Sequence, residues 1–176
     1  RILSEDIKSK QVLASVGQSI LMAWYTRKFR RHNIITAQVL ATHATLEDIE
    51  SHRAQFVITV WNILEAGILP IINENDALST AEMQALGRGA DNDQNALLVA
   101  RYLTASEIVL ITNTDWVYAD KNDRRSRIDT IQGATITDDW VKATCGEKSE
   151  KWTGGMQSKL RIGREFAEIG GITHIC

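Results

Sequence analysis

Short apolar runs alternate with longer stretches of helical spacing along the chain, and this alternation is what most constrains the fold. The apolar runs cover residues 37–42, 68–72, 107–112 and 172–175. Strands buried on both faces read as continuous apolar runs, whereas the helices that cover them show apolar residues three and four positions apart. The sequence therefore predicts an α/β protein with a mostly parallel sheet and helices on both faces.

Helices are expected over about 5–31, 46–66, 93–105 and 137–143, and from 156 to 169. In the first of them the spacing predicts a buried face made of Leu13, Val16, Ile20 and Trp24. Gly67 is expected to end the second helix, and Gly170 and Gly171 the last one. The intervening residues 73–90 and 113–135 are polar, and the first of these stretches is long for a loop in a compact domain.

Composition excludes several classes of protein. The chain has 176 residues, a net charge of −2 and 24% charged residues, so one globular domain is expected and a nucleic-acid partner is not. No apolar stretch is long enough for a membrane helix, the first ten residues contain no hydrophobic region like that of a signal peptide, and Cys145 and Cys176 lack metal-binding spacing. We expect a soluble, cytoplasmic protein with free thiols. Both ends fall inside predicted elements, which suggests part of a longer domain.

The stretch from Ile68 to Asn95 is the first candidate site. An apolar run ending at Ile72 is followed by Asn73, Glu74, Asn75 and Asp76, and a second polar cluster, 91–93, comes just before a helix. In open α/β sheets ligands bind at the carboxyl ends of the strands, which is where these side chains are expected. The alternative is that Asn and Asp serve here as turn formers and helix caps.

Two further stretches could contact an anion. Residues 153–159, TGGMQSK, form a glycine turn that runs into a helix with a lysine in its first turns, and backbone N–H groups at a helix start attract phosphate. A lysine there can neutralise a phosphoryl group during transfer. Thr112 and Asn113, at the end of the apolar run 107–112, could hold a nucleotide. A solvated lysine and ordinary turn chemistry are the alternatives for these two stretches.

Taken in order, these motifs are more specific together than singly. KQVLASVGQ at 10–18, AQVLAT at 37–42, PIINENDA at 70–77, DND at 91–93 and TGGMQSK at 153–159 occur in one chain. With this set the sequence resembles the glutamate 5-kinases of the amino-acid kinase family over nearly its whole length.

The resemblance implies a three-layer αβα sandwich with a mainly parallel central sheet, of which residues 1–176 would be an incomplete domain. It implies transfer of the ATP γ-phosphate, with Mg²⁺, to the side-chain carboxylate of glutamate, the first step toward proline. Proline as a feedback inhibitor and a homo-oligomer are further expectations. No nucleic acid or membrane is expected as a partner.

The resemblance also assigns site residues. Lys159 would stabilise the transition state and Asp93 would orient the catalytic lysines. Substrate would be bound by Asp76, Asn92 and Asn73. The nucleotide would be bound by Thr112, Asn113, Thr153, Gly154, Gly155, Met156, Gln157, Ser158 and Lys159.

The sequence departs from the family pattern in places. The family's first strand, with its lysine and glycine-rich phosphate loop, does not precede Arg1. Asn113 stands where the family has aspartate, and Trp116 and Trp152 stand where it has glycine, which permits close approach of a ligand. An alternative is therefore a non-catalytic amino-acid-binding or regulatory relative with a degraded ATP cleft.

Overall fold

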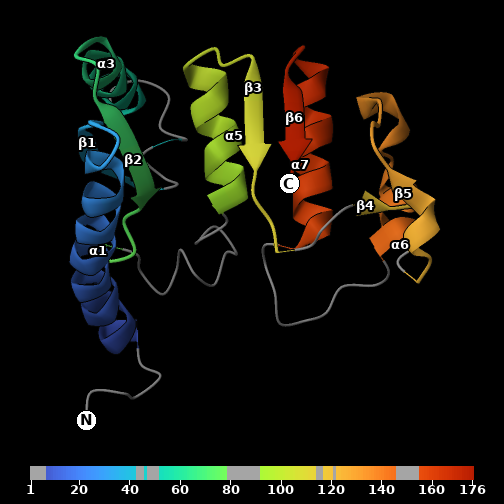
Figure 1. Cartoon of the computed structure of the whole chain (residues 1–176), viewed down its shortest axis with the longest axis horizontal. Helices are drawn as coiled ribbons and strands as arrows, with labels where there is room; N and C mark the ends of the chain where they lie inside the picture. Colours follow the sequence, from blue (N-terminus) through green and yellow to red (C-terminus); the bar gives the residue numbers. More distant parts are fainter. Residues whose placement is uncertain are drawn as a thin grey trace. The chain divides into compact units, whose positions relative to one another are not determined.

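The structure is a computed structural model that describes residues 7–42, 46, 52–78, 92–113, 117–120, 122–145 and 155–176, with only the backbone described at 7–10. The chain forms two compact units, residues 1–90 and 91–176. Figure 1 labels the helices and strands of both.

The first unit is built on a pair of parallel strands. Its elements are α1 (Ile7–Arg30), β1 (Thr36–Ala41), α3 (His52–Glu65) and β2 (Leu69–Glu74). Thr36 lies opposite Leu69, and the register runs to Ala41 opposite Glu74. Helix α1 contacts β1, and α3 contacts both strands through a face that buries Phe56 and Val60. The prediction that β2 ends at Ile72 is wrong, because Asn73 and Glu74 continue the pairing with β1.

The glycine predicted to end α3 does so through its backbone conformation. Gly67 has a φ of +72°, its N–H donates to the Leu64 carbonyl over 2.9 Å, and the Ile68 N–H donates to the Ile63 carbonyl over 3.1 Å. This pair of bonds satisfies two carbonyls at the helix end and turns the chain directly into β2. A side chain at position 67 would be strained there.

The predicted buried face of α1 is wrong. Leu13, Val16, Ile20 and Trp24 are 47%, 57%, 66% and 46% exposed in the structure. The half-buried side chains are instead at positions 11, 14, 18, 22, 25 and 29, which also follow the three-and-four spacing. Apolar residues occur on both sides of this helix, so the spacing fits two stripes, and the one turned towards the strands includes Gln18.

The second unit is also built on parallel strands. Its elements are α5 (Asn92–Tyr102), β3 (Glu107–Leu110), β4 (Val117–Tyr118), η1 (Arg124–Ser126), β5 (Arg127–Ile128), η2 (Gly133–Thr135), α6 (Asp138–Cys145), α7 (Met156–Glu168) and β6 (Ile172–Ile175). In the β3–β6 pair, Glu107 lies opposite Ile172 and Leu110 opposite Ile175. The strands β4 and β5 form a small antiparallel hairpin.

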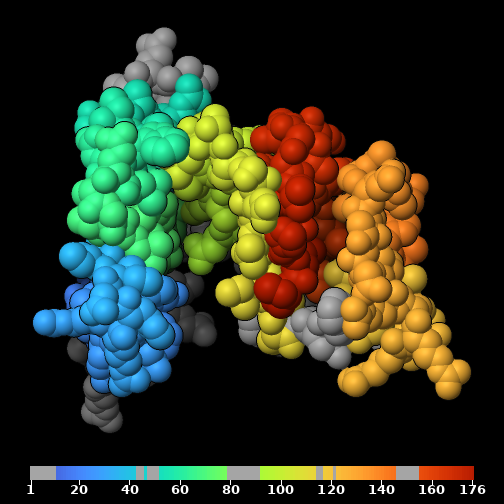
Figure 2. Space-filling view, turned by 45° about the horizontal axis from the view of Figure 1, so that its top comes forward, coloured from blue at the N-terminus to red at the C-terminus, as the bar shows by residue number. Residues whose placement is uncertain are grey.

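The core of the second unit lies between α5, α7 and the strand pair. Helix α5 contacts β3, α7 contacts β6, and the two helices contact each other. In Figure 2, α5 and β3 (yellow-green) pack directly against α7 and β6 (red). The buried cluster consists of Leu97, Ala100, Ile108, Leu110, Ile162 and Phe166. Leu160 and Phe166 of α7 are buried, whereas Ile169, directly after the helix, is 55% exposed.

The observed fold is α/β with parallel strand pairs, as the alternation of elements predicts. The β4–β5 hairpin has no counterpart in the prediction, because strands of two residues have no readable alternation. In the part of the chain that the structure describes, no helix is long and apolar enough to span a membrane.

Candidate functional site

Gly155 of the TGGMQSK motif lies directly before the first turn of α7. Gly155 is the N-cap residue with an extended backbone, φ −80° and ψ −178°, and its carbonyl accepts from the Ser158 and Lys159 N–H groups over 3.0 and 3.3 Å. A glycine N-cap supplies no side-chain acceptor to the first amides, which lie at the positive end of the helix dipole. This arrangement suits an anion.

Lys159 lies on the buried face of the same helix. The residue is 8% exposed, next to the buried Leu160. The alternative reading of a solvated lysine is therefore wrong. A buried ammonium needs a partner of opposite charge, because an isolated charge away from water is strongly unfavourable.

Asp93 is that partner. The Lys159 Nζ donates to Asp93 Oδ1 over 3.0 Å and to Oδ2 over 2.9 Å, and the two side chains are 10% and 15% exposed. Asp93 is in the first turn of α5, where the helix dipole also favours a carboxylate. The structure thus brings together the two residues predicted to be catalytic, which are 66 positions apart. Their catalytic roles stay predictions.

The remaining predicted nucleotide residues are placed near the same end of the strands or lie outside the described residues. Thr112 follows β3, and its N–H donates to the Cys176 carbonyl over 2.7 Å, which extends the β3–β6 pairing. Asn113 is exposed, and Met156, Gln157 and Ser158 are half-buried in the first turn of α7. Thr153 and Gly154 lie outside the described residues, as do Trp116 and Trp152.

The first unit holds a cavity at the end of β2. The cavity has a volume of about 440 Å³ and is lined by one face of α1, by β1, and by the chain that leaves β2. The lining includes Asn73 and Asp76 from the predicted substrate residues, with Glu74 between them. Asp76 is exposed in the turn that follows the strand, and Glu74 is 5% exposed. Asn92, predicted to bind substrate, is exposed as the first residue of α5 in the second unit.

A residue that the sequence analysis left without a role also lines this cavity. Gln18 of α1 accepts, through Oε1, a hydrogen bond of 2.9 Å from Asn73 Nδ2. The signal in the sequence is weak, since Gln18 reads as one more polar residue on a helix. It becomes visible only once the stripe 14, 18, 22, 25 and 29 is known to face the strands.

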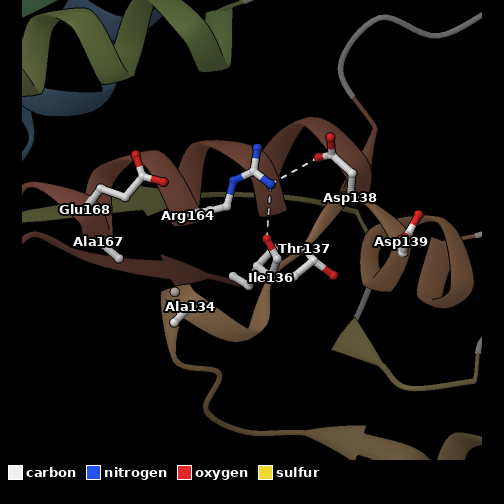
Figure 3. Close-up of a pocket in the computed structure, with 9 residues that line it drawn as sticks. Ala134, Ile136, Thr137, Asp138, Asp139, Arg164, Ala167 and Glu168 are labelled. Carbon is white, nitrogen blue, oxygen red and sulfur yellow. Dashed lines mark hydrogen bonds and ion pairs between the residues drawn. The ribbon is translucent and has the colours of Figure 1, made fainter.

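A further cavity of about 600 Å³ lies beside the other end of α7 (Figure 3). There Arg164 Nη1 donates to the Ile136 carbonyl over 3.2 Å and to Asp138 Oδ1 over 3.0 Å. Asp139 and Glu168 also line it. The carboxylate bonded to the Arg164 guanidinium is that of Asp138 (Figure 3). None of the predicted site residues lines this cavity.

The two cysteines differ in environment. Cys145 is half-buried at the end of α6, and burial raises the pKa of its thiol above the ordinary value of 9.0. Cys176 is exposed. Both are free thiols, as predicted. No group of three or more His, Cys, Asp or Glu side chains suited to a metal ion occurs among the residues that the structure describes.

Comparison of the sequence with known proteins identifies the family of this chain. The model of the amino acid kinase family matches residues 3–176. The chain belongs to this family. Relatives named glutamate 5-kinase align with most of this chain.

Three such relatives illustrate the similarity. The glutamate 5-kinase of Oceanobacillus iheyensis is 34% identical over 93% of this chain and 43% of its own length. That of Thermobifida fusca is 37% identical over 96% of this chain and 42% of its own length. That of a Synechococcus strain is 36% identical over 96% of this chain and 46% of its own length. The chain thus spans less than half the length of these relatives.

Proposed function

We propose that the protein carrying this chain transfers the γ-phosphate of ATP to the side-chain carboxylate of glutamate. The observation that carries the proposal is the buried Lys159–Asp93 pair at the glycine-capped start of α7, in a chain of the amino acid kinase family. Further support comes from the relatives that are named glutamate 5-kinase.

The reaction breaks the bond between the γ-phosphorus and the oxygen that bridges it to the β-phosphate, and forms a bond from that phosphorus to a glutamate carboxylate oxygen. The products are γ-glutamyl phosphate and ADP. Such a transfer needs alignment and positive charge more than it needs a strong base. Lys159 supplies a fixed cation, and the two contacts from its Nζ to the Asp93 carboxylate hold that cation in one position.

The start of α7 fits the phosphates of ATP. Among the described residues, none lies close to the point where a side chain would begin at Gly155, so a phosphate can approach the backbone there. The first amides of the helix favour an anion. Mg²⁺ fits as an ion held mainly through those phosphates, because it commonly keeps several waters and few protein ligands. When bound, it neutralises charge that develops on the phosphoryl oxygens.

The cavity of the first unit fits the amino acid. The Asp76 carboxylate and the side-chain oxygen Oδ1 of Asn73 are acceptors suited to an ammonium group. Glu74 adds a further carboxylate to the lining. The substrate-binding role of Asn92, which lies in the second unit, stays a prediction. Feedback by proline and self-association stay predictions.

The alternative of a non-catalytic relative with a degraded ATP cleft rests on Asn113, Trp116 and Trp152, of which the structure describes Asn113. The buried contact between Lys159 and Asp93 does not favour this alternative.

The assay that tests the proposal uses the full-length gene product with ATP, Mg²⁺ and glutamate, in the presence of hydroxylamine. Hydroxylamine traps an acyl phosphate as a hydroxamate, which can be quantified by its coloured iron complex. Hydroxamate should form with glutamate and not with aspartate. Absence of glutamate-dependent hydroxamate, together with absence of glutamate binding by calorimetry, would overturn the proposal.

Asp76→Asn tests the amino-acid end separately. The change keeps the side-chain size and removes the charge that would face the ammonium, so we expect the KM for glutamate to rise about tenfold or more while the KM for ATP stays the same. Glu65→Gln is the matched control, since Glu65 is exposed at the end of α3 and does not line the cavity. Equal KM values in the Asp76 variant and the control would contradict the assignment.

A further inference from the structure

Gln18 joins two walls of the cavity in the first unit. Its Oε1 accepts from Asn73 Nδ2 over 2.9 Å, across 55 residues of chain, and both residues line the cavity. Because the Nδ2 group of Asn73 is committed to Gln18, the Asn73 Oδ1 is left as the acceptor of that amide. The bond therefore fixes which way the Asn73 amide points.

The other end of the Gln18 amide has no such bond. Gln18 Nε2 is buried and has no hydrogen-bond partner among the described residues. Buried donors are nearly always satisfied in native structures, so each exception requires an explanation. Because Gln18 is one of the residues that line the cavity, a ligand in the cavity is a candidate partner for this buried donor.

The charges of the cavity indicate which ligand group this donor meets. Among the residues that line it, all in the described part of the chain, none is Lys, Arg or His, whereas Glu74 and Asp76 are acidic. An ammonium thus has charged partners, but a carboxylate entering this cavity has only neutral donors. The amide of Gln18 is a neutral donor with no bond to replace.

We propose that Gln18 recognises the α-carboxylate of the amino acid, with Nε2 donating to one of its oxygens. The Asn73 Oδ1 and the Gln18 Nε2 belong to two amides in direct contact, so they meet two groups that are close together in the substrate. The α-ammonium and α-carboxylate share one carbon and satisfy this condition. The γ-carboxylate then stays free for phosphorylation. The identity of the ligand rests on the function proposed above.

Gln18→Glu is the decisive variant. It keeps the shape and an oxygen acceptor for Asn73 Nδ2, but replaces the donor with a second oxygen. In the hydroxylamine assay on the full-length gene product, we expect the KM for glutamate to rise about tenfold to a hundredfold, with the KM for ATP unchanged. In L-isoglutamine the α-carboxylate is replaced by a carboxamide, which can donate to the new Glu side chain. The KM for L-isoglutamine should therefore rise much less than the KM for glutamate. The preference in kcat/KM for glutamate over isoglutamine should fall at least about tenfold.

Gln55→Glu is the matched control, because Gln55 is exposed on α3 and does not line the cavity. Its preference should equal that of the wild type. Circular dichroism and an unchanged KM for ATP check that the Gln18 variant is folded. A wild-type enzyme that uses glutamate, with an unchanged preference in a folded Gln18→Glu variant, would overturn the role of Gln18 alone. A wild type that neither binds nor phosphorylates glutamate would overturn the proposed function, and the role of Gln18 with it.

Discussion

Replacing Lys159 with methionine should affect stability and activity by separable amounts. Methionine fills a similar volume without the charge, so the core around α7 stays packed. The Nζ–Oδ2 distance of 2.9 Å corresponds to a gross attraction of about 6 kcal/mol at an effective dielectric constant of about 20. Much of this offsets the desolvation of the two groups. Losing one partner leaves the Asp93 carboxylate buried, which should lower the free energy of unfolding by about 3 kcal/mol.

The double variant Lys159→Met with Asp93→Asn separates the two effects. With both charges gone, no uncompensated charge is buried, so its loss of stability should be about 2 to 3 kcal/mol smaller than the sum of the two single losses. Urea unfolding, followed by circular dichroism, measures all four proteins. The activity should not recover, because the fixed cation contributes about a hundredfold to a thousandfold to kcat.

Two results would refute this reasoning. Additive stability losses in the double variant would mean that the two side chains are not energetically coupled. Glutamate-dependent hydroxamate formation at the wild-type rate in either Lys159 variant would remove the lysine from the chemistry.

The remaining predictions concern packing and thiols. Gly171→Ala should lower stability by about 1 to 3 kcal/mol, since the new methyl group would overlap the ring of the buried Phe166; the control Gly17→Ala, in open space on α1, should raise the urea midpoint. Iodoacetamide at pH 8 should alkylate the exposed Cys176 well before Cys145, which peptide mass spectrometry can follow, and equal rates would contradict the burial of Cys145. Because the folded pKa of Cys145 is raised, its neutral form is favoured in the fold, so the wild type should lose stability relative to Cys145→Ser as the pH rises above 9.0.

The sequence predicted well wherever one local signal has one physical reading. Gly67 marks the end of α3 because a left-handed residue is needed there, and its φ of +72° confirms it. The run 172–175 was predicted with the bounds that β6 has. The contact between Asp93 and Lys159 was also predicted, although only through the family resemblance and not from the spacing.

The failures occurred where the sequence allows two readings of equal quality. Helix α1 has two apolar stripes, and nothing local states which of them β1 covers, so the predicted face is on the wrong side. The role of Gln18 depends on that choice and could not be read without it. The end of β2 was placed too early because Asn73 and Glu74 are polar, whereas pairing with β1 continues through them.

Helix α7 has a consequence for engineering this protein. The same 13 residues supply Lys159 to the proposed phosphate site and Ile162 and Phe166 to the hydrophobic cluster. Substitutions in this helix that are selected to change the phosphoryl donor would also lower the free energy of unfolding of the second unit. Variants with new donor preference should therefore be sought among residues 146–154, which precede α7 in the sequence, or be built on a background already made more thermostable elsewhere.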